Sequence, residues 1–272
     1  MFQLKDEIIC IRGAGDIATG VIQKFVRSGF RVLALETIKP TTIRRQVALS
    51  TAMLGGEMQV EDIRARRVED IDEQFEQCWA EGIVPVIADS AGVSIRRIKP
   101  AAVIDAIMAK KNMGTNRRMA PVTIGLGPGF SAPEDVNAVI ETMRGHRLGQ
   151  LILSGQALPN TGTPGEIGGQ SHLRVIHAPA AGKVRHCAEI GDWLKQGQPV
   201  FQIGDTVVLA PFDGLLRGLI AEGMEVMKGL KTADIDPRKL EREECYGISD
   251  KARCIGGGAL EAYLFLKAFS RN

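Results

Sequence analysis

The 272-residue sequence lacks the features of a membrane, extracellular or nucleic-acid-binding protein. No apolar run approaches the roughly 20 residues that a membrane-spanning helix needs. The acidic start around Asp6 and Glu7 does not resemble a signal peptide. Aromatic residues make up only 5% and the formal net charge is +2, which disfavours a stacking or strongly basic nucleic-acid surface. We therefore expect a soluble cytoplasmic protein that binds neither a membrane nor a nucleic acid.

Metal-binding and nucleophilic motifs are also missing. The five cysteines are scattered without a C-x-x-C pair, and the four histidines lack the spacing of a zinc site. We expect no disulfide framework and no metal, and no Ser-His-Asp or paired-carboxylate motif indicates an enzyme. Cys245 has Lys251 and Arg253 nearby but also three glutamates, so it is a candidate reactive thiol or an inert buried one. Cys10 is expected in the core.

Glycine is abundant, with 31 residues among 272, above the usual share of ~7%. The first cluster, Gly13–Ala18, follows an apolar strand at Glu7–Ile11 and fits the G-x-G-x-x-G/A pattern of dinucleotide-binding folds. A helix at Ile17–Ser28 and a strand at Phe30–Leu35 are predicted next. Glu36 then stands where such folds hold a ribose hydroxyl.

Asp16 makes classical NAD binding less favourable, because a carboxylate at a helix start repels a pyrophosphate. Asp16 is therefore kept as a candidate catalytic residue or ligand contact. The motif predicts a nucleotide-like or pterin-like ligand, or a tight turn with none.

Further strands and helices extend this pattern. We expect Gly125, Gly127 and Gly129 to form a second glycine loop at the carboxyl edge of a parallel sheet, where ligands of such folds collect. The expected elements are strands at 83–88, 121–124 and 148–153 and helices at 100–109 and 131–144, the last with an S-x-x-E capping box.

Basic clusters occur throughout this half, and most are interpreted as solvated faces. Arg44-Arg45 comes soonest after the position of Glu36. We therefore consider this pair a possible phosphate contact.

The C-terminal half contains an internal repeat. Residues 178–205 and 210–237 share seven identities at a shift of 32, including three glycines and an Ala-Pro pair. Such phasing predicts two copies of one β unit packed together. The segment resembles the barrel-sandwich fold of lipoyl and biotinyl carrier domains. No lysine occurs from Gln196 to Leu216, where a carrier displays its modified lysine, so we expect neither lipoate nor biotin.

Two breaker-rich segments flank the repeat, Pro159–Gln170 and Ile248–Gly258. They are read either as a linker and a turn, or as loops whose backbone N–H groups bind an anion with Lys251 and Arg253. The second segment leads into an apolar helix at Ala259–Phe269 that must be buried against the sheet. The glycines singled out as ligand contacts here are Gly256, Gly257 and Gly258.

Five motifs together resemble the YqeB-type accessory proteins of selenium-dependent molybdenum hydroxylases. They are Arg12–Gly20, Gly125–Phe130, Arg144–His146, Asn160–Gly169 and Ile248–Gly258. The resemblance implies a role in maturing such a hydroxylase or its molybdopterin cofactor. It also implies the hydroxylase, or proteins of cofactor biosynthesis, as partners.

The fold class expected is α/β: a Rossmann-like parallel-sheet domain at 1–155, a linker at 156–171, a barrel-sandwich domain at 172–236, and a C-terminal segment, 237–272, that packs on the first domain. The function expected is maturation of the hydroxylase, with a nucleotide or molybdopterin dinucleotide bound in one cleft lined by the loops at 13–16, 125–129 and 256–258. The alternatives are an NAD(P)-dependent oxidoreductase and a non-catalytic docking module for a hydroxylase.

Overall fold

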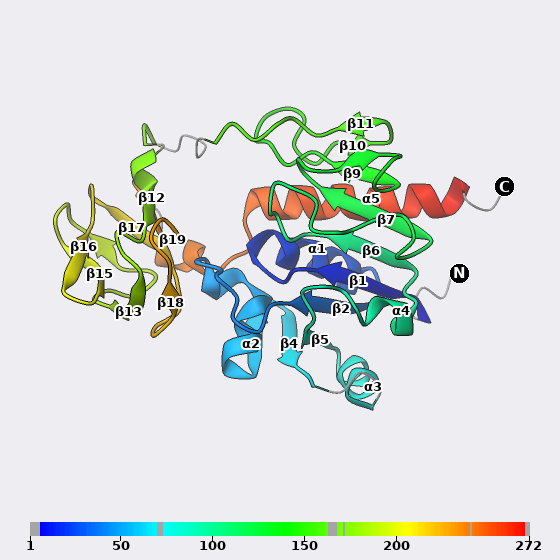
Figure 1. The fold of residues 1–272 in the computed structure, drawn as a ribbon, viewed down its shortest axis with the longest axis horizontal. Helices are drawn as coiled ribbons and strands as arrows, with labels where there is room; N and C mark the ends of the chain where they lie inside the picture. The colour runs from blue at the N-terminus through cyan, green and yellow to red at the C-terminus, as the bar shows by residue number, and fades with distance from the viewer. Residues whose placement is uncertain (1–5, 70–72, 163–167, 171, 240, 270–272) are drawn as a thin grey trace. The chain divides into compact units, whose positions relative to one another are not determined.

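The computed structural model describes residues 6–69, 73–162, 168–170, 172–239 and 241–269 (Figure 1). The chain divides into two compact units. The first comprises Met1–Pro40, Ala48–Asn160 and Ile248–Asn272, and the second Thr41–Val47 and Thr161–Gly247. Nothing in the sequence indicated that Thr41–Val47 leaves the first unit to pack within the second.

A nine-stranded mixed sheet forms the centre of the first unit, in the order β10-β9-β7-β6-β1-β2-β5-β4-β3. Its members are parallel from β9 through to β4, and β10 and β3 join antiparallel at the two ends. The bounds are β1 Ile8–Arg12, β2 Arg31–Glu36, β3 Glu57–Val60, β4 Ile63–Arg67, β5 Ile83–Ala88, β6 Ala102–Asp105, β7 Val122–Leu126, β9 Ala138–Ile140 and β10 Leu151–Ile152. A separate pair joins β8 Ser131–Ala132 to β11 Gly155–Gln156. The parallel α/β sheet expected from the glycine motif is confirmed.

The helices of this unit are α1 Asp16–Arg27, α2 Ala52–Gly55, α3 Glu73–Ala80, α4 Ile95–Ile98 and α5 Asp250–Phe269, with a 3-10 turn at Leu49–Thr51. The long helix α5 runs beside α1 and contacts β7, β9 and β10 (Figure 1). Its expected return to the sheet is confirmed. No helix within the described ranges is long and apolar enough to cross a bilayer.

Two predicted helices are strands or irregular chain. The helix expected at 100–109 is replaced by β6, because the short apolar run Ala102–Ile104 is buried between β1 and β7. The helix expected at 131–144 is replaced by β8 and β9. The capping-box contact does form, with Ser131 Oγ donating to Glu134 Oε2 at 2.7 Å, but Ala138–Ile140 then pairs with β7 instead of continuing a helix.

The second unit contains two four-stranded sheets, β12-β19-β17-β14 and β16-β15-β13-β18, in which neighbouring strands are antiparallel. The strands recur with the predicted shift of 32 residues. The first copy is β12 Val175–His177, β13 Gly182–His186, β14 Trp193–Leu194 and β15 Pro199–Ile203; the second is β16 Thr206–Leu209, β17 Gly214–Leu219, β18 Glu225–Val226 and β19 Lys231–Asp236. The closer likeness to a barrel-sandwich carrier domain stays a prediction.

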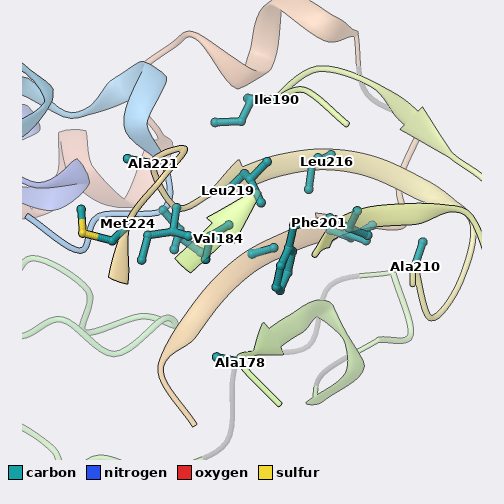
Figure 2. Packing of buried hydrophobic residues seen from close by; sticks show 14 of the residues in the cluster. Ala178, Val184, Ile190, Phe201, Ala210, Leu216, Leu219, Ala221 and Met224 are labelled. Carbon is teal, nitrogen blue, oxygen red and sulfur yellow. The ribbon is translucent and has the colours of Figure 1, made fainter. Parts of the chain in front are cut away.

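One apolar core joins the two copies, as Figure 2 shows. Phe201 and Leu216, which come from different copies, are both fully buried in it. The turn between the copies is Gly204-Asp205, and Gly204 takes a φ of +56° in this tight hairpin. Two 3-10 segments, His172–Arg174 and Arg242–Cys245, complete the unit together with a third at Arg45–Val47.

Candidate functional site

The strand order of the large sheet changes direction beside β1. Strands β2 to β5 all lie on one side of β1, and the later strands β6, β7 and β9 lie on its other side. In open α/β sheets, ligands bind outside the carboxyl ends of the strands at this switch point. The turn at Gly13–Asp16 directly follows β1 there, so this edge is the candidate site.

Gly13 is required by the packing of this turn. Its φ is +100°, and a Cβ added there would lie 3.0 Å from the carbonyl oxygen of Ala106, just after β6. Its N–H donates to the carbonyl of Leu35 at 2.7 Å. The glycine therefore lets the ends of β1 and β6 approach each other.

Glu36 braces the same turn from the end of β2. One carboxylate oxygen accepts the N–H of Ala14 at 2.9 Å, and the other accepts the N–H of Thr37 at 2.7 Å. Glu36 lies at the position predicted for a ribose contact, but both of its carboxylate oxygens already accept backbone N–H groups.

The first turn of α1 presents backbone donors at this edge. Asp16 opens the helix after Gly15, and no side chain caps it. Within the described residues, the N–H groups of Gly15 and Ile17 have no acceptor. Free N–H groups and the positive end of the helix dipole favour an anionic ligand.

The start of α5 lies near the start of α1, because the two helices run in the same direction. Gly20 of α1 faces Ala252 of α5: a Cβ added at Gly20 would lie 2.5 Å from the carbonyl oxygen of Ala252. Near the other end, the ring of Tyr263 contacts the ring of Phe25 at 5.8 Å between centroids. Both helix N-termini therefore point to the carboxyl edge of the sheet.

Lys251, the second residue of α5, is the cation at this junction. Its pKa lies below the ordinary lysine range because of burial and the positive charge of Arg144. The negative charges of Asp16, Asp250 and Glu141 oppose that shift. A half-buried lysine of this kind can bind an anion or exchange a proton with a ligand.

Glu141 and Arg144, which both follow β9, make the contacts that hold this part of the unit together. The buried Glu141 accepts the N–H groups of Thr142, Met143 and Leu158 at 2.7 to 2.8 Å, and so anchors the loop that follows β9. Arg144 binds both carboxylate oxygens of Asp250, at 2.9 and 3.2 Å. Neither residue was singled out from the sequence as a site residue.

Gly127 and Gly129 follow β7 at the expected edge, whereas Gly125, expected in the same loop, lies within the strand, and protein atoms fill the space around all three glycines. A Cβ at Gly125 would collide with the ring of Phe130, and one at Gly127 would collide with Thr142 Oγ1. Gly129, with a φ of +108°, would bring a Cβ within 2.6 Å of Lys111 Cα. These glycines are therefore needed for packing, whether or not the loop also contacts a ligand.

The glycines at 256–258 are not a loop, so that prediction is wrong. All three lie inside α5, which begins at Asp250. A Cβ at Gly256 would lie 2.5 Å from the Gly20 carbonyl oxygen, and one at Gly258 would collide with the Gly149 carbonyl. Close packing of α5 on its neighbours explains two of the three.

A buried polar network lies under the switch point and was missed from the sequence. Arg12, 1% exposed, donates to Thr115 Oγ1 and, at 2.9 Å, to the carbonyl of Ser90. Thr115 donates to Asp105 Oδ2 at 2.6 Å, and the guanidinium lies 3.6 Å from that carboxylate. Burial raises the pKa of Asp105, opposed by Thr115, Ile107 and Arg12. The network ties the ends of β1, β5 and β6 together. Its only signal in the sequence was that β1 and β6 each end in a charged residue.

Cys245 does not have the environment of a reactive thiol. It is 1% exposed, its Sγ lies 3.9 Å from the Leu216 carbonyl, and burial raises its pKa. A raised pKa reduces the thiolate fraction on which nucleophilic chemistry depends. Cys10 is fully buried, as predicted.

The possible phosphate contact at Arg44-Arg45 lies within the second unit. Arg45 Nε donates to the Leu219 carbonyl at 2.6 Å, and the Leu219 N–H donates to Ile43 at 2.8 Å. The pair therefore attaches Thr41–Val47 to β17. Among the described side chains, no group of three or more His, Cys, Asp or Glu could hold a metal ion.

Comparisons with known proteins agree with the likeness to YqeB and do not bear on a role in maturation. No family model matches the chain. Over 260 residues it is 48% identical to a protein of Escherichia coli strain K12 named "Uncharacterized protein YqeB", covering 96% of this chain and 48% of that one. The chain is therefore similar to this protein over nearly all of its own length. The chain spans about half the length of the YqeB protein that it matches.

Likeness to solved structures is weak. An aspartoacylase family protein from Mesorhizobium loti has a TM-score of 0.25 at 13% identity, covering 79% of this chain and 59% of that one. A succinylglutamate desuccinylase/aspartoacylase from Rhodobacter sphaeroides has a TM-score of 0.27 at 10% identity, covering 84% and 85%. Scores at this level carry no inference about the fold or activity of this chain.

Proposed function

We propose that this chain is an accessory protein in the maturation of a selenium-dependent molybdenum hydroxylase, and that it binds an anionic, nucleotide-bearing cofactor at the carboxyl edge of its large sheet. The motif resemblance supports the maturation role. One observation carries the binding site: the close approach of Gly20 to Ala252 packs α1 and α5 side by side, which brings Asp16 and Lys251, in the first turns of the two helices, to the carboxyl edge of the sheet beside the switch point.

The charges at this corner fit a ligand with both an anionic and a hydrogen-bond-donating part. Lys251 and the N–H groups of Gly15 and Ile17 suit phosphate oxygens. Asp16 suits a hydroxyl or a ring N–H, because a carboxylate only accepts hydrogen bonds. A molybdopterin dinucleotide or a simpler nucleotide presents both kinds of group.

An NAD(P)-dependent oxidoreductase is less well supported. A ribose hydroxyl would have to share Glu36 with the N–H groups of Ala14 and Thr37 that it already accepts. Binding a ribose there would therefore weaken contacts that hold the glycine turn.

A thermal-shift screen against CTP, molybdopterin dinucleotides, NAD(H) and NADP(H) tests the ligand class. A ligand at 100 times its Kd adds about 2.7 kcal/mol to the free energy of unfolding. We expect this stabilisation with a cytidine or molybdopterin nucleotide and a smaller one with NAD(H). Stabilisation by NADP(H) or NAD(H) alone would favour the oxidoreductase, and no stabilisation by any of them would contradict the proposed cofactor site.

A cellular experiment tests the maturation role. The hydroxylase is purified from cells with and without this protein, and its molybdenum and selenium contents are measured per polypeptide. We expect the absence of this protein to lower one or both contents while the amount of hydroxylase polypeptide is unchanged. Fully loaded hydroxylase from cells lacking the protein would contradict the role.

A further inference from the structure

A basic groove lies on the first unit, apart from the corner around Lys251. It is an open cavity of about 1140 Å³ whose lining includes Arg96, Lys99, Arg117 and Arg118, with Glu134 as its one carboxylate. Arg96 belongs to α4, Lys99 leads into β6, and the other two arginines lead into β7. The groove therefore reaches the amino ends of β6 and β7, and its lining also includes Ala91, Gly92 and Val93 in the loop after β5.

The charge in this groove is unbalanced. Four cations against one carboxylate leave a net charge of +3, whereas the whole chain has a net charge of +2. Across the described residues, Arg96, Lys99 and Arg118 have no carboxylate partner. Glu134 accepts the hydroxyl of Ser131 at 2.7 Å, so part of its capacity is already used. Like charges gathered in a concave surface strengthen one another's attraction for an anion.

The backbone holds these cations in place. Lys99 has a φ of +49° at the end of α4, a left-handed conformation that glycine or asparagine adopts with less strain. Asn116 Oδ1 accepts the N–H of Arg118 at 3.0 Å, and the guanidinium of Arg117 donates to the Pro133 carbonyl at 3.1 Å. The left-handed backbone at Lys99 and the hydrogen bonds of Asn116 and Arg117 therefore fix the segments that carry these cations.

The lining also restricts the kind of anion. Guanidinium groups form paired hydrogen bonds with phosphate oxygens, and the cavity is far larger than a single phosphate. No aromatic side chain lines the groove, so the base stacking that single-stranded nucleic acids use has no platform there. We propose that this groove binds a small molecule with two or more linked phosphate groups.

Calorimetric titration with tripolyphosphate, pyrophosphate and inorganic phosphate tests this proposal. We expect saturable binding that strengthens with the number of linked phosphates and weakens at least tenfold from 0.05 to 0.5 M NaCl, because salt screens exposed charges. The double variant Arg96→Met, Arg118→Met should bind tripolyphosphate at least tenfold more weakly. Arg185→Met, which removes an exposed arginine of the second unit, should bind within about twofold of the unmodified protein.

Further titrations distinguish binding in this groove from binding at the cofactor site, and phosphate binding from the binding of other anions. In the background of Lys251→Met, which removes the cation of the proposed cofactor site, tripolyphosphate should still bind, and the double variant should still weaken that binding at least tenfold. The proposal is overturned if Lys251→Met abolishes binding while the double variant retains it, if citrate binds as tightly as tripolyphosphate, or if the unmodified protein shows no saturable binding. Melting temperatures of all variants without ligand show whether each one folds.

Discussion

Two neighbouring glycines of α5 should respond in opposite ways to the same substitution. At Gly256 an added Cβ would lie 2.5 Å from the carbonyl oxygen of Gly20 and 3.0 Å from Lys24 Cγ. At Gly257 it would meet no atom within 4 Å. Because both residues are helical, the two substitutions differ mainly in what surrounds the new methyl group.

The expected free-energy changes follow from this difference. Gly256→Ala forces α5 away from α1, and overpacking of this kind typically destabilises by about 1–3 kcal/mol. Gly257→Ala adds no clash and reduces the backbone entropy lost on folding, which should stabilise by about 0.5–1 kcal/mol. A change of 1 kcal/mol corresponds to a shift in Tm of roughly 2–4 °C in a domain of this size.

Calorimetric or urea unfolding of the two variants and the unmodified protein measures both effects. The calorimetric transition to follow is that of the first unit, which contains both helices. A loss of stability in Gly257→Ala comparable with that in Gly256→Ala would refute the reasoning, since it would mean that both positions are packed or that neither is helical. No change in Gly256→Ala would show that α1 and α5 do not approach so closely.

Three further predictions concern other parts of the molecule. Gly127→Ala should destabilise the first unit by at least about 1 kcal/mol in urea unfolding, because its φ is +79° and a Cβ would collide with Thr142; an unchanged midpoint would contradict this close contact. Burial raises the pKa of Tyr263 to about 12. In the variant Tyr246→Phe, which leaves Tyr263 as the single tyrosine, ultraviolet titration of the phenol should have its midpoint near pH 12, and a midpoint near 10 would mean that the ring is exposed. Arg27 lowers the pKa of the half-exposed Asp62 to about 2, so the ion pair should stabilise the protein above pH 4 and lose its effect as pH falls through 2. Asp62→Asn should lower stability by less than about 1 kcal/mol at pH 6 and by clearly less at pH 2, where the carboxyl is partly protonated; an equal loss at both would contradict the ionic origin.

The first βαβ unit and the repeat could be predicted because local patterns determine them. The apolar β1, the turn at Gly13 and the amphipathic α1 agree in sequence and structure. The repeat was legible because glycines and an Ala-Pro pair at a constant spacing mark equivalent turns in both copies.

The errors arose where tertiary contacts override local signals. Ala102–Asp105 is short enough for a strand or a helix, and only its position between β1 and β7 decides for the strand. The run Gly256–Gly258 has the composition of a loop, yet close approach of α1 and Gly149 makes glycine the residue that fits at two of its three positions in a helix. Sequence spacing could not reveal such approaches.

The candidate site was predicted in part. The turns after β1 and β7 do lie on one edge of the sheet, as expected for parallel strands, and a ligand site at this edge stays a prediction. Lys251 was noted as a nearby charge, but its place at this edge depends on α5 running parallel to α1, which no local pattern encodes.

Equilibrium titration of the tightest-binding nucleotide from the thermal-shift screen, into the unmodified protein, Lys251→Met and Lys251→Arg, tests the proposed site most directly. We expect Lys251→Met to raise the Kd at least tenfold, and Lys251→Arg, which keeps the positive charge, to raise it less. Equal affinity of all three proteins, in variants that retain the melting temperature of the unmodified protein, would contradict the placement of the ligand at the N-termini of α1 and α5.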